Sequence, residues 1–474
     1  MKKLIYFLTT LLIFPISGQS QNLESVEYIG TTTSFVLAVV SGLPIEYNVD
    51  MYKIVYSTID ANGNPTIASG AFMMPATEEC TDFPLAVYQH GTSLNKEEVP
   101  SRDNGEAILP KILAGGGFYT ITTDYIGMGD SPGLHPYMHA ESEATAAIDM
   151  MRAVRQYLND SLEIQDNGEI FITGYSQGGH AAMALHKYIE DNELLEEFDV
   201  ITSAPASGPY AMSESQMDLI ISNEPYSNPG YLVYVLSSYE LAYGNIYDEY
   251  SDVLQSPYDT IVVPYFNGNN TTLSMGDLNP LLPQQVQDLM QPDYYADLIT
   301  DENHPLRLAL VDNDNYNWAP ERPITMYYCT EDEQVTFQNT LTALEYMTTN
   351  GASDVTAVNS GPFSHGDCVL PALTGIYNLF QSLKTPCTLT GIAENQLISN
   401  IYPNPTSSRL TVLTTEPVDR YELLNALGQV VLESDNSQHY NQFELNLDDI
   451  ENGVYYLRLF KNGNHYSSKS ILKM

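Results

Sequence analysis

From residue 84 onward, short apolar runs alternate with longer stretches whose apolar residues recur at helical spacing. The runs are apolar throughout, which is typical of strands buried on both faces of a sheet. Strands that alternate with helices predict a mostly parallel sheet with helices on both faces, which is an α/β fold. The expected strands are 84–89, 118–123, 169–174, 198–205, 323–329 and 354–359, and the expected helices are 141–158, 181–190 and 335–349.

Two segments depart from this alternation. Residues 49–58 and 66–74 have the pattern of strands and are joined by a turn rich in Asn and Gly, so they predict a hairpin. Residues 211–320 are rich in Tyr, Asn, Asp and Pro, and their apolar parts are helical pieces such as 231–244 and 281–290. This segment is predicted to be an insertion lying over the sheet.

The N-terminus predicts a signal peptide over residues 1–20. A positive start precedes the apolar run 4–16, and Gly18 and Ser20 supply small residues for cleavage. The apolar run is too short to span a membrane as a helix. The chain is therefore expected to be exported through the periplasm and to act outside the cell or on its surface.

Charge restricts the partners of this protein. The chain has 18 Lys and Arg against 60 Asp and Glu, a formal net charge of −42. Such a surface repels nucleic acid and anionic lipid headgroups. We therefore expect no nucleic-acid partner, and we interpret the acidity as a solvated surface.

The pentapeptide Gly174-Tyr175-Ser176-Gln177-Gly178 joins an expected strand to an expected helix. This is the context of a nucleophile elbow, in which a serine occupies a strained turn. Side chains at the two glycine positions would collide with the neighbouring strand and helix. Ser176 is therefore the predicted nucleophile.

A serine hydroxyl needs a base, and the base needs an orienting carboxylate. His365 is the one histidine after the serine that is placed in a loop at the expected carboxyl edge of the sheet. Asp332 follows the strand 323–329 by three residues and is the predicted acid. Its neighbours are Glu331 and Glu333, and the alternative is that all three are solvated loop charges. The pattern of a loop acid, two spacers and an apolar helix start at Val335 favours Asp332.

Two backbone N–H groups are predicted to bind an oxyanion. One belongs to Gln177, and the other to Thr92 in the loop after strand 84–89. The glycine-rich segment 124–139 lacks the Lys-Ser/Thr pair of a phosphate loop, so it is interpreted as a loop that lines a pocket.

The four cysteines are Cys80, Cys329, Cys368 and Cys387. In an exported chain an even number predicts disulfides, and three pairings are open. The preferred one joins Cys329 to Cys368, which would tether the Asp332 loop to the His365 loop, and Cys80 to Cys387. No cysteine or histidine spacing indicates zinc, so neither a metal nor a cofactor is predicted.

A second domain is expected at the C-terminus, because 474 residues exceed one ordinary domain. The polar segment 388–400 is a predicted linker. Short strand segments separated by turn signals follow it and predict a small β-sandwich. These segments are 401–413, 421–433, 443–450 and 453–463.

Residues 45–385 resemble the α/β-hydrolases, and among them the bacterial secreted lipases and esterases. The resemblance implies a hydrolase domain over 21–387 and a lid-like cap over about 211–320. It also implies the same site residues: the triad Ser176, Asp332 and His365, and the oxyanion donors Thr92 and Gln177. The motifs that carry it are "SGAFMMP", "QHGT", "DYIGMGDSPGLHPY", "GYSQGGHAA", "WAPERP", "CTEDEQV" and "SHGDC".

Residues 401–474 resemble the C-terminal sorting domain of type IX secretion. "YPNP", "LGQVV", "GVYYLRL" and the basic end "KSILKM" carry this resemblance. It implies transport across the outer membrane by the type IX machinery, followed by removal of the tail or its exchange for a surface anchor.

These observations predict a secreted serine hydrolase that cleaves carboxylic esters of small molecules or lipids through an acyl-enzyme. A serine peptidase or amidase on the same fold is one alternative. A catalytically silent surface binding module is the other, and the presence of all three triad residue types argues against it.

Overall fold

A computed structural model describes residues 22–77, 79–222, 224–387, 398–425, 428–435, 441–461 and 464–474. The predicted signal peptide and most of the predicted linker lie outside these residues. The chain divides into two compact units, Met1–Cys387 and Thr388–Met474, which are described separately.

The first unit is built on a nine-stranded sheet in the order β1-β2-β3-β5-β4-β6-β7-β8-β9. The strands from β1 to β5 along this order pair antiparallel, and those from β5 to β9 pair parallel. The predicted α/β class is therefore confirmed. The strands are β1 (Leu23–Thr32), β2 (Val49–Ile59), β3 (Pro65–Pro75), β4 (Leu85–Gln89), β5 (Tyr119–Thr123), β6 (Glu169–Tyr175), β7 (Asp199–Ala206), β8 (Ile324–Tyr328) and β9 (Val355–Asn359).

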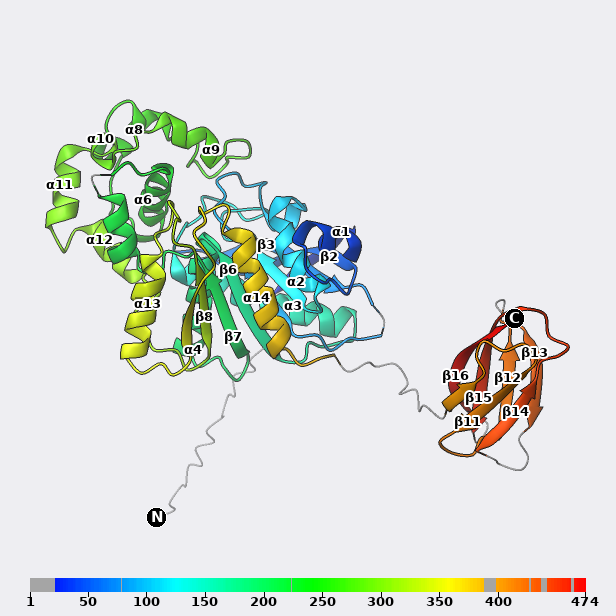
Figure 1. Ribbon diagram of the computed structural model, residues 1–474. Helices are drawn as coiled ribbons and strands as arrows, with labels where there is room; N and C mark the ends of the chain where they lie inside the picture. Colours follow the sequence, from blue (N-terminus) through cyan, green and yellow to red (C-terminus); the bar gives the residue numbers. More distant parts are fainter. Residues whose placement is uncertain are drawn as a thin grey trace, which may run out of the picture. The chain divides into compact units, whose positions relative to one another are not determined.

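Helices cover both faces of this sheet because its strands present apolar side chains alternately to either side. In β4, Leu85 and Val87 join the apolar cluster under α3 and α4, whereas Ala86 and Tyr88 join the cluster under α2 and α14. Figure 1 shows α14 lying across its face of the sheet. One face carries α3 (Ala140–Ser161), α4 (Gln177–Asp191) and α13 (Gln338–Thr349); the other carries α1 (Ser34–Ser41), α2 (Ile108–Gly115) and α14 (Val369–Leu383).

The segment between β7 and β8 folds into helices with an apolar core of their own. Leu232, Leu236 and Leu254 are among the buried residues of that core. Figure 1 shows its helices gathered to one side of the sheet, in green. None of the described helices is long and apolar enough to cross a membrane. The helices are η3 (Met212–Gln216), α5 (Met217–Ile220), α6 (Gly230–Tyr243), α7 (Tyr250–Val253), α8 (Tyr258–Ile261), α9 (Met275–Leu278), η4 (Asn279–Leu281), α10 (Val286–Leu289), α11 (Pro292–Thr300) and α12 (Pro305–Asp312).

The second unit is a small sandwich of a three-stranded sheet, β10-β11-β14, and a four-stranded sheet, β13-β12-β15-β16. Leu410, Leu423, Leu445 and Leu457 lie in the apolar core between the sheets. The strands are β10 (Ile398–Tyr402), β11 (Arg409–Thr414), β12 (Arg420–Leu424), β13 (Val430–Asp435), β14 (Gln442–Asn446), β15 (Gly453–Lys461) and β16 (Asn464–Lys473).

Two of the predicted tail segments are divided in the structure. The segment 401–413 contains the end of β10 and most of β11, because Pro403 and Pro405 interrupt it. The segment 421–433 contains parts of β12 and β13, with Gly428 at φ 76° in the turn between them. The β-sandwich itself was predicted correctly.

Candidate active site

Ser176 lies on the sharp turn between β6 and α4. Its φ of 61° and ψ of −121° are strained for a residue with a side chain. A Cβ on Gly178 would lie 1.9 Å from the carbonyl oxygen of Gln89, and one on Gly174 would lie 2.1 Å from the carbonyl oxygen of Gly178. Only glycine fits at both positions, which is the crowding expected of a nucleophile elbow.

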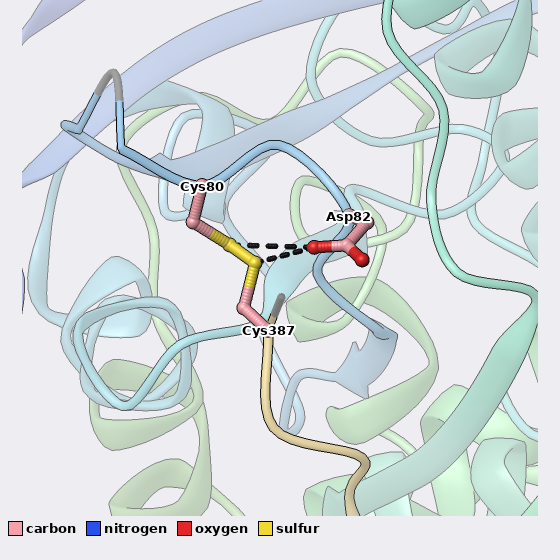
Figure 2. A group of neighbouring side chains, drawn as sticks. All are labelled: Cys80, Asp82 and Cys387. Carbon is pink, nitrogen blue, oxygen red and sulfur yellow. Dashed lines mark hydrogen bonds between the residues drawn. A yellow bond between two sulfur atoms is a disulfide. The ribbon is translucent and has the colours of Figure 1, made fainter. Parts of the chain in front are cut away.

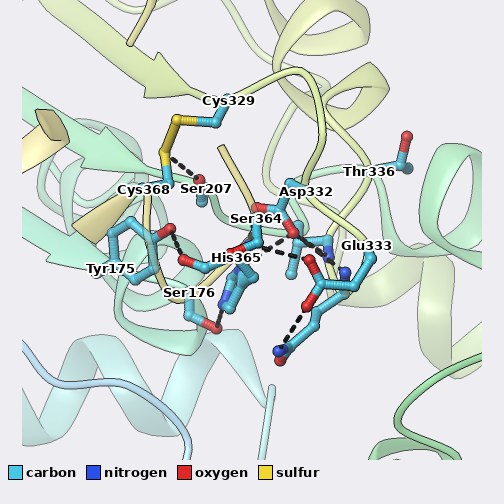
Figure 3. A network of polar contacts seen from close by, with 12 residues as sticks. Tyr175, Ser176, Ser207, Cys329, Asp332, Glu333, Thr336, Ser364, His365 and Cys368 are labelled. Atoms are coloured by element: carbon cyan, nitrogen blue, oxygen red, sulfur yellow. Dashed lines mark hydrogen bonds and ion pairs between the residues drawn. A yellow bond between two sulfur atoms is a disulfide. The ribbon is translucent and has the colours of Figure 1, made fainter. Parts of the chain in front are cut away.

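Three of the predicted site residues form a row of contacts in which His365 lies within hydrogen-bonding distance of both Ser176 and Asp332 (Figure 3). The Oγ of Ser176 is 2.9 Å from Nε2 of His365. The Nδ1 of His365 is 2.9 and 2.8 Å from the two carboxylate oxygens of Asp332. Ser176 and His365 are 8% and 7% exposed, so the contacts are shielded from bulk water.

These contacts determine where the proton on His365 lies. An ionised carboxylate only accepts hydrogen bonds, so Nδ1 of His365 carries the hydrogen and donates it to Asp332. The Nε2 atom is then free to accept the hydroxyl hydrogen of Ser176. Chemically, the arrangement can remove a proton from Ser176 and return it to a leaving group.

Backbone donors hold the Asp332 carboxylate in place. Asp332 lies in the loop after β8, where its Oδ1 accepts hydrogen bonds from the N–H groups of Gln334 at 3.1 Å and Val335 at 2.9 Å. Its side chain is 1% exposed. The carboxylate therefore cannot turn away from His365 without leaving these donors unsatisfied.

Two further residues hold the backbone of His365. Its N–H donates to Oε2 of Glu333 at 3.0 Å, and its carbonyl oxygen accepts the Tyr175 hydroxyl at 2.6 Å. Burial raises the pKa of Glu333, but the hydrogen bond from the His365 backbone and other donors outweigh it, so the net pKa is lowered. Neither role was predicted from the sequence. The pattern around Asp332 offered Glu333 only as a neighbouring loop charge, and nothing in the sequence around Tyr175 indicated its contact.

A disulfide joins the ends of the two loops that carry Asp332 and His365. It links Cys329, directly after β8, to Cys368, directly before α14 (Figure 3). The second disulfide links Cys80 to Cys387. The preferred pairing from the sequence is therefore the one found.

Asp82 lies against the second disulfide (Figure 2). Among the described residues, Cys80, Asp82 and Cys387 are the one group of His, Cys, Asp or Glu side chains spaced to hold a metal ion. Both sulfurs are shared in the disulfide and offer no thiolate. This donor set does not fit a metal ion.

The two predicted oxyanion donors belong to segments that meet at the elbow. Gln177 is the first residue of α4, and the first N–H groups of a helix have no partner within it. Thr92 follows β4, whose last residue, Gln89, crowds Gly178. The hydroxyl oxygens of Thr92 and Tyr137 lie 3.0 Å apart. That the two N–H groups bind an oxyanion remains a prediction.

The insertion contacts the loop that carries Asp332. Residues of the insertion form hydrogen bonds with Gln334 of this loop. Its carbonyl oxygen accepts the Tyr226 hydroxyl at 3.2 Å and the Gln216 amide at 3.1 Å. The Tyr231 hydroxyl donates to its side-chain oxygen at 3.0 Å.

A mostly parallel sheet with a strained serine after β6 and a histidine–carboxylate pair in the following loops defines an α/β-hydrolase. Within that class, the chain belongs to the secreted bacterial lipases and esterases. It is 30% identical to the rice cell wall degrading esterase LipA from Xanthomonas oryzae, with a TM-score of 0.69 over 77% of this chain and 99% of that one.

More distant structures share the fold. A Legionella pneumophila protein is 24% identical, with a TM-score of 0.69 over 76% of this chain and 98% of that one. Lipase A of Candida antarctica is 15% identical, with a TM-score of 0.56 over 78% of this chain and 84% of that one. No curated protein sequence matches the chain.

Residues 400–473 match the family described as a secretion system C-terminal sorting domain. The tail therefore marks the protein for type IX secretion to the cell surface or beyond, as the sequence predicted.

Proposed function

We propose that this protein is a secreted serine hydrolase that cleaves carboxylic esters through an acyl-enzyme. The chain of contacts Ser176–His365–Asp332 at the elbow carries the proposal. The likeness to an esterase at 30% identity supports the ester as substrate class.

In the proposed reaction, Ser176 Oγ attacks the ester carbonyl carbon while His365 Nε2 takes the hydroxyl proton. The N–H groups of Gln177 and Thr92 stabilise the oxyanion of the tetrahedral intermediate. His365 then protonates the leaving alcohol, and the acyl group remains on Ser176. Asp332 stays ionised and holds the imidazole in its tautomer.

Deacylation repeats these steps with water as the nucleophile. His365 takes a proton from the water and returns it to Ser176 Oγ, which releases the carboxylic acid. The insertion serves as a cap over the acyl site, because it bonds the Asp332 loop at Gln334. The signal peptide over 1–20 directs passage through the periplasm, and the tail interacts with the type IX machinery.

The experiment is release of p-nitrophenol from acetyl, butyryl and palmitoyl esters, with active-site labelling by a fluorophosphonate. We expect a burst equal to the enzyme concentration and a label on Ser176. Hydrolysis of peptide anilides in preference to the esters would favour the peptidase alternative. Absence of both turnover and labelling would favour a silent binding module. Ester-bearing plant cell wall polymers are tested as further substrates, because the Xanthomonas oryzae relative is a rice cell wall degrading esterase.

A further inference from the structure

A fully buried polar network lies next to the proposed oxyanion donor Gln177. The Nε2 amide of Gln177 donates to Nε2 of His135 at 2.7 Å and to Oε1 of Glu143 at 2.9 Å. The other carboxylate oxygen of Glu143 accepts Nδ1–H of His180 at 2.7 Å. Gln177 and His180 are 0% exposed, Glu143 is 1% exposed and His135 is 2% exposed.

The protons in this network can be assigned from its acceptors. The Nδ1 of His135 faces the carbonyl oxygen of Ile126 at 2.9 Å, so it carries a hydrogen and leaves Nε2 to accept from Gln177. Burial lowers the pKa of His135 to about 3, so this ring is neutral. Two acceptors, His135 and Glu143, thus fix the orientation of the Gln177 amide.

His180 differs because both of its nitrogens face acceptors. Its Nε2 donates to the carbonyl oxygen of Asn313 at 3.0 Å, and its Nδ1 donates to Glu143. Burial alone would lower the pKa of His180, but the charge of Glu143 outweighs it and the net pKa is raised. The His180–Glu143 pair is thus buried with a hydrogen-bond acceptor at each ring nitrogen, and its members are costly to separate.

The pair also connects the elbow to the insertion. Asn313 follows α12, and its side chain accepts from the N–H of Ala140 at 2.7 Å and donates to the carbonyl oxygen of Ala309 at 2.8 Å. One chain of hydrogen bonds therefore runs from the end of the insertion through His180 and Glu143 to Gln177.

We propose that Glu143 and His180 are positioning residues that hold Gln177 so that its backbone N–H points at the oxyanion. The inference rests on the proposed function. Oxyanion donors accelerate a reaction only when they are oriented before the charge develops. Glu143 and His135 hold the side chain of Gln177. Because the backbone N–H belongs to the same residue, this anchor also restricts the direction of the N–H. Loss of the anchor lets the first turn of α4 shift while Ser176 and His365 remain in contact.

Three variants of the full chain test this proposal: Glu143→Ala, Glu143→Gln and Glu190→Ala. Glu190 is the matched control, because it also pairs with a buried histidine of α4, His186, at 3.0 Å, but does not contact Gln177. Glutamine at 143 can accept from Gln177 and donate to a neutral His180, so it restores the hydrogen bonds without the charge. The readouts are kcat and KM for p-nitrophenyl butyrate, the Ki of an alkyl trifluoromethyl ketone, and Tm.

For Glu143→Ala we expect kcat to fall about 10- to 100-fold with KM nearly unchanged, because oxyanion contacts act in the transition state. The ketone forms an oxyanion on Ser176, so its Ki should rise by a similar factor. Glu143→Gln should recover most of kcat. Glu190→Ala should lower Tm without this selective loss.

The proposal is overturned if folded Glu143→Ala keeps its kcat, if the loss is in KM, or if Glu190→Ala loses kcat equally. Should Glu143→Ala not fold, Gln177→Leu makes the same test, since it removes the anchor and keeps the N–H. A wild-type protein that neither turns over esters nor binds the ketone would instead refute the proposed function.

Discussion

Two of the buried imidazole–carboxylate pairs among the described residues, His365–Asp332 and His180–Glu143, look alike and are equipped for different chemistry. His365 contacts Asp332 at 2.8 Å, and His180 contacts Glu143 at 2.7 Å. The difference is the group at the other ring nitrogen: the hydroxyl of Ser176 for His365 and the carbonyl oxygen of Asn313 for His180. A hydroxyl can give up a proton and a carbonyl cannot. A buried pair therefore becomes a candidate base only through its third partner.

The two pairs also differ in how they are held. Glu143 and His180 lie on α3 and α4, two long helices packed on the same face of the sheet. Asp332 and His365 lie on loops, whose ends are joined by the Cys329–Cys368 disulfide. A loop site needs such additional constraints to keep its geometry, because loops lack the regular hydrogen bonds of helices.

Removing the third partner of His365 is expected to have the largest effect on activity. In Ser176→Ala, His365 and Asp332 remain paired but have no hydroxyl to activate, as is already the case for His180. We expect loss of ester hydrolysis and of fluorophosphonate labelling, with Tm nearly unchanged. Labelling that persists in the variant would show that another residue is the nucleophile.

The second test changes the carboxylate of each pair. Asp332→Asn presents an N–H to Nδ1 of His365, which forces the hydrogen onto Nε2, and we expect kcat to fall by about 10⁴ as in a serine protease triad. Glu143→Gln should cost far less, since His180 does not transfer protons in the proposed reaction.

Glu331→Gln and Glu333→Gln are the controls on the same loop. Glu333→Gln is expected to have a moderate effect, because an amide oxygen can still accept from the His365 backbone. Steady-state kinetics at saturating substrate measure all of these changes. A larger loss in Glu331→Gln than in Asp332→Asn would mean that the wrong acid was chosen.

The two disulfides provide the third test. The Cys329–Cys368 bridge spans 39 residues beside the candidate site, and the Cys80–Cys387 bridge spans 307 residues away from it. In the chain-entropy view, their loss costs about 4 and about 6 kcal/mol respectively. The two double Cys→Ala variants should therefore rank in opposite orders for the loss of kcat and for the loss of Tm. Removal of the first bridge lowers kcat by about tenfold because a small misplacement of reacting groups is costly, and removal of the second lowers Tm more.

Much of this arrangement could be predicted from the sequence because its determinants are local. The elbow at Ser176 is signalled by a strand, two glycines and a helix within a few residues, and the structure shows the crowding that requires those glycines. Asp332 and His365 follow strands of a parallel sheet, so their loops were expected at one edge. Their catalytic roles stay predictions.

The remainder depends on packing between segments far apart in the chain. Glu143 and His180 are 37 residues apart, and no local pattern distinguishes Glu143 from a solvated residue in the first turn of a helix. Strand β1 and helix α1 were missed, because β1 has irregular burial and register shifts and α1 leaves Phe35 75% exposed. No pattern in the sequence indicates that β5 lies between β3 and β4 in the sheet.

A smaller effect is expected from Asp314, which follows Asn313 and lies near His180. Its carboxylate accepts the N–H and hydroxyl of Ser213 at 3.0 and 2.5 Å. Burial raises the pKa of Asp314 from 3.8 to about 6. Between these values the folded state binds more protons than the unfolded state, so this group makes stability fall as pH rises from about 4 to about 6.

Asp314→Asn should remove that contribution. We expect the Tm of the variant to exceed that of the wild type at pH 7 by a few degrees and to match it near pH 4. Differential scanning calorimetry across this range measures the change. A Tm difference that grows as pH falls would contradict the assignment.

The smallest effect is expected from removing the tail, because both imidazole–carboxylate pairs lie within the unit Met1–Cys387. The tail has its own apolar core, including Leu410 and Leu457, and the Cys80–Cys387 disulfide closes the first unit at its last residue. A chain of residues 21–387 should thus keep kcat and KM within about twofold of the full protein. In a host with type IX secretion, the chain with its signal peptide but without residues 388–474 should accumulate in the periplasm, because it lacks the sorting domain. Activity assays of the purified short chain and fractionation of the host measure the two effects separately. A short chain that folds but loses most of its activity would show that the tail contributes to the site, and the division of function between the two units would have to be abandoned.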